Sequence, residues 1–123
     1  HASADVYDYL RERRDVCLKA GLKPENICVD PGIGFGKTDA HNLLILRQMA
    51  MFQGLGCAVT LGVSRKSFIG RVADVPTAKD RLPGSLAAAV AGAGRGVQIL
   101  RVHDVAETRQ ALAVWRAISI SEA

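Results

Sequence analysis

The chain has 123 residues, which is enough for one domain with a hydrophobic core and too few for two. Its composition is 49% hydrophobic but only 5% aromatic, which argues against an aromatic-rich β-sandwich and favours helices packed closely on a sheet. The net charge is +4, but the basic residues are scattered among acidic ones and form no stripe with aromatic residues, which argues against a nucleic-acid partner.

The first predicted element is an amphipathic helix over residues 4–20, where apolar residues recur at helical spacing among charged ones. Ser3 can cap its start, and Gly21 fits the position just after its end. A turn over residues 23–26 follows, and residues 27–29 are predicted to form a short buried strand.

A second helix is predicted to begin at Thr38 or Asp39, either of which can cap it, and to end at Gly54 and Gly56. After it, residues 58–63 form an apolar run that predicts a second buried strand.

The pattern after Ser67 is less regular because Pro76 and Pro83 interrupt it. The remaining predicted elements are an alanine-rich helix over residues 84–93, a strand over residues 97–102 and a final helix over residues 105–118.

Three successive strand–loop–helix units predict an α/β fold with a parallel sheet, since about 30 residues or a little more separate one strand end from the next. A parallel sheet needs both faces covered, or closure into a barrel. Three strands alone leave two open edges. The chain also begins with His1 rather than Met, so we expect that an N-terminal part is missing.

The three cysteines, Cys17, Cys28 and Cys57, are far apart and show no metal-ligand spacing. We expect them to be buried free thiols in a reducing cytoplasm. No apolar run approaches the roughly 18 residues of a membrane span, and no signal peptide is visible, so no membrane partner is expected.

Each predicted strand ends in a cluster of glycines and charged residues, and the carboxyl ends of parallel strands are where α/β folds place their chemistry. In the first cluster, residues 30–38, a phosphate-binding P-loop and a dinucleotide fingerprint each fail by one glycine. Asp30 can accept two hydrogen bonds from an aminopyrimidine edge, or it can simply cap the turn. Phe35, which glycines flank, is predicted to face a ligand or to serve as a lid.

In the second cluster, Arg65 and Lys66 come directly after a buried strand, and Ser67 can cap a short helix. Helix N-termini and adjacent cations attract anions, whereas the alternative is two solvated surface cations.

In the third cluster, Arg101 and His103 share one face of an extended segment and could grip a phosphate together, although the histidine could also be structural. A catalytic triad of Ser64 or Ser67 with His103 and Asp104 is a further alternative, without the nucleophile elbow that such triads use in α/β hydrolases.

Four segments in order and at approximate spacing resemble the dihydropteroate synthase family of the folate pathway: Asp30-Pro-Gly-Ile-Gly-Phe-Gly-Lys, Ser64-Arg-Lys-Ser-Phe-Ile-Gly, Arg81-Leu-Pro-Gly-Ser-Leu-Ala-Ala and Arg101-Val-His-Asp-Val. The family is a (β/α)8 barrel. The chain resembles only its C-terminal portion, the last three strand–helix pairs with the preceding helix. By this resemblance, residues 1–123 are a partial pterin-binding barrel domain.

The resemblance implies that Asp30 holds the aminopyrimidine edge of a pterin. Lys66 would contact the pterin ring near 4-aminobenzoate, with Gly34 and Gly62 lining the substrate site. Phe35 and Ser67 would shape the 4-aminobenzoate pocket, the helix start at Ser67 receiving the carboxylate.

Arg101 and His103 would bind the diphosphate leaving group. The implied catalytic residues are therefore Asp30, Lys66, Arg101 and His103.

The family reaction condenses 7,8-dihydropterin pyrophosphate with 4-aminobenzoate and releases diphosphate, with Mg2+ assisting. Its metal-binding residues belong to the N-terminal half that this chain lacks, so we expect the isolated chain to be inactive. The resemblance also implies a homodimer through the last helices.

Two alternatives remain: a pterin- or folate-binding barrel module of a methyltransferase, and a piece that folds only by pairing its open strand edges with another copy.

Overall fold

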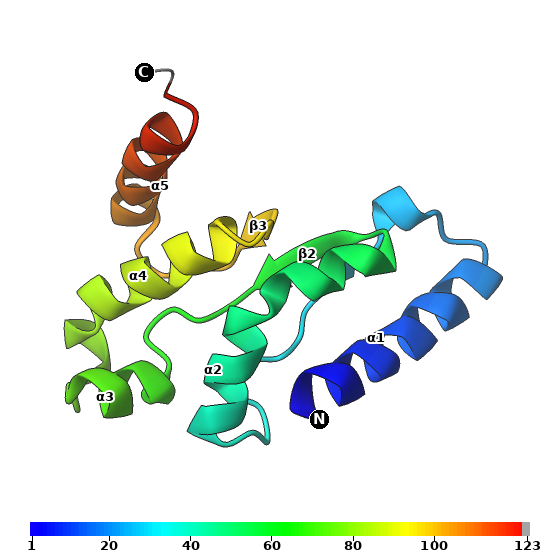
Figure 1. Ribbon diagram of the computed structural model, residues 1–123, viewed down its shortest axis with the longest axis horizontal. Coiled ribbons are helices and arrows are strands. Elements are labelled where there is room, and N and C mark those ends of the chain that lie inside the picture. The colour runs from blue at the N-terminus through cyan, green and yellow to red at the C-terminus, as the bar shows by residue number, and fades with distance from the viewer. Residues whose placement is uncertain (122–123) are drawn as a thin grey trace.

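The computed structural model describes residues 1–121 and has the α/β architecture that the sequence predicts (Figure 1). Its longer helices are α1 (Ala2–Lys19), α2 (Asp39–Arg47), α3 (Ser67–Ala73), α4 (Leu82–Ala93) and α5 (Val105–Ser119). Short 3-10 helices are η1 (Pro24–Asn26), η2 (Met49–Leu55) and η3 (Ala78–Asp80), and the strands are β1 (Cys28–Val29), β2 (Ala58–Leu61) and β3 (Ile99–Leu100).

The three strands form one parallel sheet in the order β1-β2-β3, so the predicted parallel arrangement is confirmed. The strands are shorter than predicted: β1 and β3 begin one and two residues later, and β2 and β3 each end two residues earlier, where the chain passes into the charged loops. Two further backbone hydrogen bonds flank β3: the Gln98 N–H donates to the Val59 carbonyl at 3.1 Å, and the Arg101 N–H donates to the Leu61 carbonyl at 3.0 Å.

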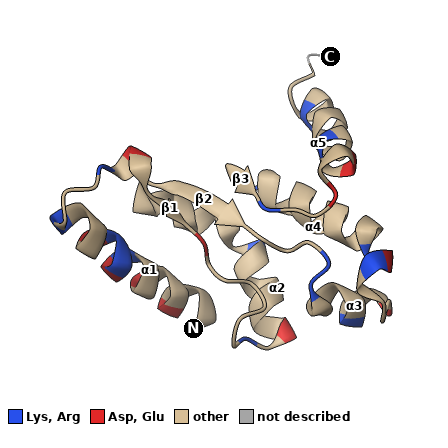
Figure 2. Cartoon of the chain, turned by 180° about the vertical axis from the view of Figure 1, so that it is seen from behind, with Lys and Arg blue, Asp and Glu red and all other residues tan. Residues whose placement is uncertain are grey.

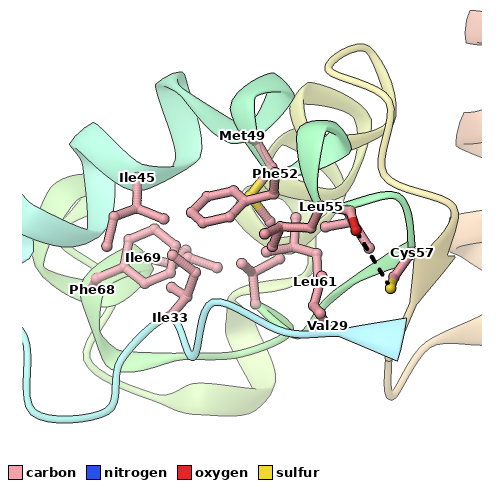
Figure 3. Close-up of a cluster of buried hydrophobic side chains, with 12 residues drawn as sticks. Val29, Ile33, Ile45, Met49, Phe52, Leu55, Cys57, Leu61, Phe68 and Ile69 are labelled. Atoms are coloured by element: carbon pink, nitrogen blue, oxygen red, sulfur yellow. Dashed lines mark hydrogen bonds between the residues drawn. The ribbon is translucent and has the colours of Figure 1, made fainter. Parts of the chain in front are cut away.

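One face of the sheet carries the hydrophobic core (Figure 3). Val29 pairs with Val59, and these two side chains with Leu61 point to the same side, where α2 and η2 supply Ile45, Met49, Phe52 and Leu55. Phe52 and Ile45 are completely buried. This alternation places the even-numbered residues of β1 and β2 on the opposite face.

The described residues cover that opposite face only in part, since Thr60 at its centre is 8% exposed. Cys28 and Ala58 are paired across β1 and β2, and Thr60 and Ile99 are paired across β2 and β3. Ile99 is 44% exposed. Cys28 is exposed and Cys17 is half-buried, so the prediction of three buried thiols is confirmed only for Cys57. Cys28 is exposed because of its register in the strand, since the neighbouring Val29 points to the core instead.

The ends of α1 are set by backbone geometry. Gly21 has a φ of +98°, and the N–H groups of Gly21 and Leu22 donate to the carbonyls of Leu18 and Cys17. This is the helix end expected for a glycine at that position. Ser3 does not cap the start, because the helix begins at Ala2 and buries the serine in its first turn.

The Thr38 hydroxyl caps α2 by accepting the N–H of His41 at 3.2 Å, as predicted. The sequence predicts one continuous helix from this cap to Gly54 and Gly56, but the structure has two: α2 ends at Arg47, and the 3-10 helix η2 follows. Gly56, with a φ of +72°, ends η2.

Ser67 is the first residue of α3 rather than its cap, so that prediction is wrong; the cap position belongs to Lys66, in extended backbone. Pro83 lies in the first turn of α4, where its missing N–H costs no hydrogen bond. Helix α5 contacts α4 and projects from the rest of the molecule (Figure 1).

Among the described residues, no helix combines the length and the apolar character that crossing a membrane requires.

Candidate active site

The loop after β1 is held in shape by its own polar groups. One carboxylate oxygen of Asp30 accepts the Gly32 N–H at 2.8 Å, so the turn-capping alternative is correct for that oxygen. The ammonium of Lys37 donates to the Gly32 carbonyl at 2.7 Å and to the Phe35 carbonyl at 3.0 Å. The Gly34 N–H donates to Oδ1 of the buried Asn42 at 2.9 Å. These contacts leave the second Asp30 oxygen facing the strand ends.

Lys66 reaches this loop from the end of β2. Its Nζ donates to the Ile33 carbonyl and lies 4.8 Å from the centre of the Phe35 ring. Partial burial lowers the pKa of Lys66, the Asp30 carboxylate opposes that shift, and the Arg101 and Lys37 cations add to it. Gly34, with a φ of +89°, leaves room for the lysine, since a Cβ there would lie 3.3 Å from Lys66 Cδ.

Arg101 extends from the end of β3 across the end of β2. Its Nη1 lies 3.6 Å from Oδ2 of Asp30, and a Cβ on Gly62 would lie only 2.4 Å from its Nη2. Arg101 therefore passes over Gly62 to reach Asp30. The predicted meeting of Asp30, Lys66 and Arg101 at one rim of the sheet is confirmed by this geometry. Figure 2 shows acidic and basic segments at these strand ends.

His103 is fixed by Ser64. The Ser64 hydroxyl accepts the backbone N–H of His103 at 3.2 Å and lies 2.8 Å from the ring Nδ1. Asp104 pairs instead with Arg65, at 3.0 Å between Oδ1 and Nη2, and therefore does not orient the imidazole. The proposed Ser–His–Asp triad is thus wrong.

A hollow of about 150 Å³ lies between the ends of β2 and β3. Its lining residues are Gly62, Ser64, Lys66, Arg101, Val102 and His103. Three of these side chains can carry positive charge, which suits an anionic ligand. Phe35 stands at 67% exposure beside this region, and Ser67 is exposed at the start of α3, where Arg71 Nη2 donates to its hydroxyl at 3.3 Å.

The sequence reasoning missed Asn42 and Lys37, which shape the loop after β1. The sequence signal for Asn42 is its place one turn after the Thr38 cap. Lys37 ends the first segment that resembles the family, but the sequence alone gives it no role.

Among the described residues, no three histidine, cysteine or acidic side chains come together in a group that could hold a metal ion. The Asp30 carboxylate, at the end of β1, is already engaged by Gly32 and Arg101.

The carboxyl ends of the parallel strands thus bring together the Asp30 carboxylate, a partly buried lysine, an arginine and a histidine. This is the arrangement of a small-molecule site in an α/β enzyme. The model of the pterin binding enzyme family matches residues 1–103, and the chain belongs to that family.

Within the family, the chain is similar to dihydropteroate synthases. It is 43% identical over 120 residues to the enzyme of Neisseria meningitidis serogroup B, covering 95% of this chain and 42% of that protein. The chain therefore spans less than half the length of this curated relative.

Solved structures also show the similarity to dihydropteroate synthases. The dihydropteroate synthase of Stenotrophomonas maltophilia superposes on all of this chain and 46% of its own, with a TM-score of 0.97 and 36% identity. The Xanthomonas albilineans enzyme, solved with 4-aminobenzoic acid and with 7,8-dihydropteroate, is 39% identical over 98% of this chain, with a TM-score of 0.96. It is matched over 44% and 46% of its length in these two structures. The fold is that of part of a (β/α)8 barrel, as predicted.

Proposed function

We propose that this chain supplies the C-terminal part of the active site of a dihydropteroate synthase. The amine of 4-aminobenzoate attacks the carbon that carries the diphosphate of 7,8-dihydropterin pyrophosphate. A C–N bond forms, the C–O bond breaks, diphosphate leaves with the electron pair, and the amine loses a proton. The observation that carries the proposal is the convergence of Asp30, Lys66 and Arg101 in a chain so similar to synthases solved with 4-aminobenzoic acid and with the product.

Asp30 would receive the aminopyrimidine edge of the pterin. Its Oδ1 is held by the Gly32 N–H, and its Oδ2 faces only the Arg101 guanidinium, at 3.6 Å. That separation is longer than a hydrogen bond, and the Arg101 side chain is 63% exposed. A pterin N–H can therefore replace Arg101 at Oδ2, while Arg101 turns to the diphosphate.

Arg101 and His103 would stabilise the charge that develops on the departing diphosphate. If the Ser64 hydroxyl donates to Nδ1 of His103, the ring carries its proton on Nε2, the nitrogen that is free to meet a phosphate oxygen. Lys66 would contact the pterin ring near 4-aminobenzoate, with Gly34 and Gly62 beside it.

Phe35 and Ser67 would border 4-aminobenzoate. Both side chains are exposed and neighbour Lys66. Ser67 follows Lys66 in the sequence, and the Phe35 ring lies beneath the Lys66 ammonium.

The resemblance to the family also predicts Mg2+, with its ligand N-terminal to this chain, and a homodimer formed through the last helices. We also propose that the protein belongs to the reducing cytoplasm, where cysteines such as Cys17, Cys28 and Cys57 stay as thiols. Residues 1–123 would then be part of a larger pterin-binding barrel domain.

The methyltransferase-module alternative explains the site less well, because such a module needs no donors for diphosphate or 4-aminobenzoate. Competitive binding of 4-aminobenzoate and a sulfonamide to the full-length protein would support the synthase, and failure of both to bind would favour the module.

The direct test is 4-aminobenzoate-dependent diphosphate release by the full-length protein, with Arg101→Ala as the variant. We expect a turnover lower by about a hundredfold to a thousandfold, the usual effect of removing one donor to a developing anion. Arg13→Ala, on the exposed side of α1, is the control and should turn over normally. An Arg101→Ala enzyme with unchanged turnover would contradict the assignment. The 123-residue chain alone is expected to release no diphosphate.

A further inference from the structure

Of the four segments that resemble the family, Arg81-Leu-Pro-Gly-Ser85 is the one for which the site so far provides no role. It begins α4 and lies behind the loop between β2 and α3, away from the hollow at the strand ends. Both of its polar side chains nevertheless contact that loop.

Arg65, in this loop, has an unusual backbone conformation. Its φ is +60°, in the left-handed region that residues other than glycine rarely adopt. Such a conformation persists only where surrounding contacts impose it, and it is found mostly at functional sites.

Three contacts impose it here. The Arg65 N–H donates to the Ser85 hydroxyl at 2.8 Å, and the Arg65 carbonyl accepts from Arg81 Nη1 at 2.9 Å. The Arg65 side chain pairs with Asp104, at 3.0 Å between Nη2 and Oδ1. Backbone donor, backbone acceptor and side chain are therefore each held from a different direction.

The two groups that hold the backbone are themselves anchored. Ser85 is only 6% exposed. Arg81 also donates through Nε to the Val75 carbonyl at 2.9 Å and through Nη2 to the Pro76 carbonyl at 2.8 Å. It passes next to Gly70, where a Cβ would lie 2.6 Å from Nε and Nη2. The guanidinium is thus fixed between two loops and cannot follow Arg65 if that residue moves.

The left-handed turn at Arg65 determines where its neighbour points. Arg65 is directed to Asp104 at the start of α5, whereas Lys66 is directed the opposite way, to the Ile33 carbonyl and the Phe35 ring. If Arg65 relaxed to an ordinary φ, Lys66 would leave the loop after β1.

We propose that Arg81 and Ser85 are positioning residues, which hold Arg65 in the left-handed conformation so that Lys66 is directed into the active site. The expected loss of kcat rests on the proposed synthase function, whereas the expected change in the position of Lys66 does not.

The test uses the full-length protein with Ser85→Ala and Arg81→Met. We expect kcat to fall by about tenfold to a hundredfold, the scale of a small misplacement of a reacting group. Arg95→Met is the matched control, because Arg95, just after the end of α4, also donates to two backbone carbonyls, Arg47 at 3.0 Å and Ala91 at 2.9 Å, but lies away from the site.

A rescue separates positioning from general stability. Glycine adopts a φ of +60° unaided, so in a chain that carries Arg65→Gly the Ser85→Ala change should alter kcat by less than about twofold. An equal loss of kcat in both backgrounds, or a loss no larger than that of Arg95→Met, would overturn the proposal.

A second readout does not depend on turnover. The Phe35 ring should shift the proton resonances of the Lys66 side chain upfield in the wild-type protein, because the ammonium lies 4.8 Å from the ring centre. Ser85→Ala and Arg81→Met should remove this shift, and Arg95→Met should keep it. Absence of turnover with this pattern intact would contradict the synthase function alone, whereas retention of the shift in Ser85→Ala would contradict the positioning role.

Discussion

Lys66 is the residue on which both substrates of the proposed reaction depend, and its protonation follows from its surroundings. Partial burial is the main reason that its pKa lies below the ordinary value of 10.5, and the Asp30 carboxylate limits the fall. The Asp30 carboxylate therefore favours the charged form of the lysine, and the surrounding burial disfavours it.

Asp30→Asn should therefore lower the pKa of Lys66 further, as measured by NMR titration of the side chain. Between the folded pKa and 10.5 the unfolded chain binds more protons than the folded one, so Lys66 should make the protein more stable as pH rises through that window. A pKa for Lys66 that rises in Asp30→Asn would refute this account.

The Arg101 side chain passes so close to residue 62 that only glycine leaves room for it there. A methyl group there would lie 2.4 Å from Arg101 Nη2, the flexible end of an exposed side chain, which can move away. We expect Gly62→Ala to change the free energy of unfolding by less than about 0.5 kcal/mol but to reduce turnover by about tenfold or more. Gly94→Ala, where the methyl meets only ordinary contacts, is the control. A Gly62→Ala protein that is destabilised but keeps its turnover would contradict this prediction.

Among the elements, α4 approaches the sheet most closely at a glycine. A Cβ on Gly92 would lie 2.4 Å from Cδ2 of the fully buried Leu61. Gly92→Ala should therefore destabilise the protein by about 1–3 kcal/mol, as overpacked cores do, with urea unfolding as the measurement. A loss no greater than that of Gly94→Ala would show that the helix shifts freely on the sheet.

Elements were predictable where the signal is local. Thr38 caps α2 and Gly21 ends α1 as expected, because both act through backbone groups a few residues away. The first strand ends at Val29 as predicted, but the second and third end two residues early, because strand length depends on pairing with the neighbouring strand and not on the apolar run alone.

The site was predictable in part for a related reason. Parallel strands bring their carboxyl ends together, so Asp30, Lys66 and Arg101 could be placed at one rim from their order alone. The contacts of Arg81 with Arg65 and of Asn42 with Gly34 depend on how α4 and α2 pack, which no pattern in either segment reports.

At the scale of the whole molecule, the partly covered face of the sheet carries the exposed Cys28, whereas Cys57 is buried in the core. If the proposed larger barrel encloses that face, alkylation of Cys28 should be slower in the full-length protein than in the 123-residue chain. Cys17, half-buried on α1, should react at similar rates in both. Equal rates for Cys28 in the two proteins would show that nothing further covers this face.

Consecutive residues after β2 are bound to consecutive residues after β3: Ser64 to His103, and Arg65 to Asp104. These two contacts tie the loops after β2 and β3 to each other. An incoming anion therefore finds the His103 imidazole already held in place, so the entropy of ordering that ring is lost on folding rather than on ligand binding.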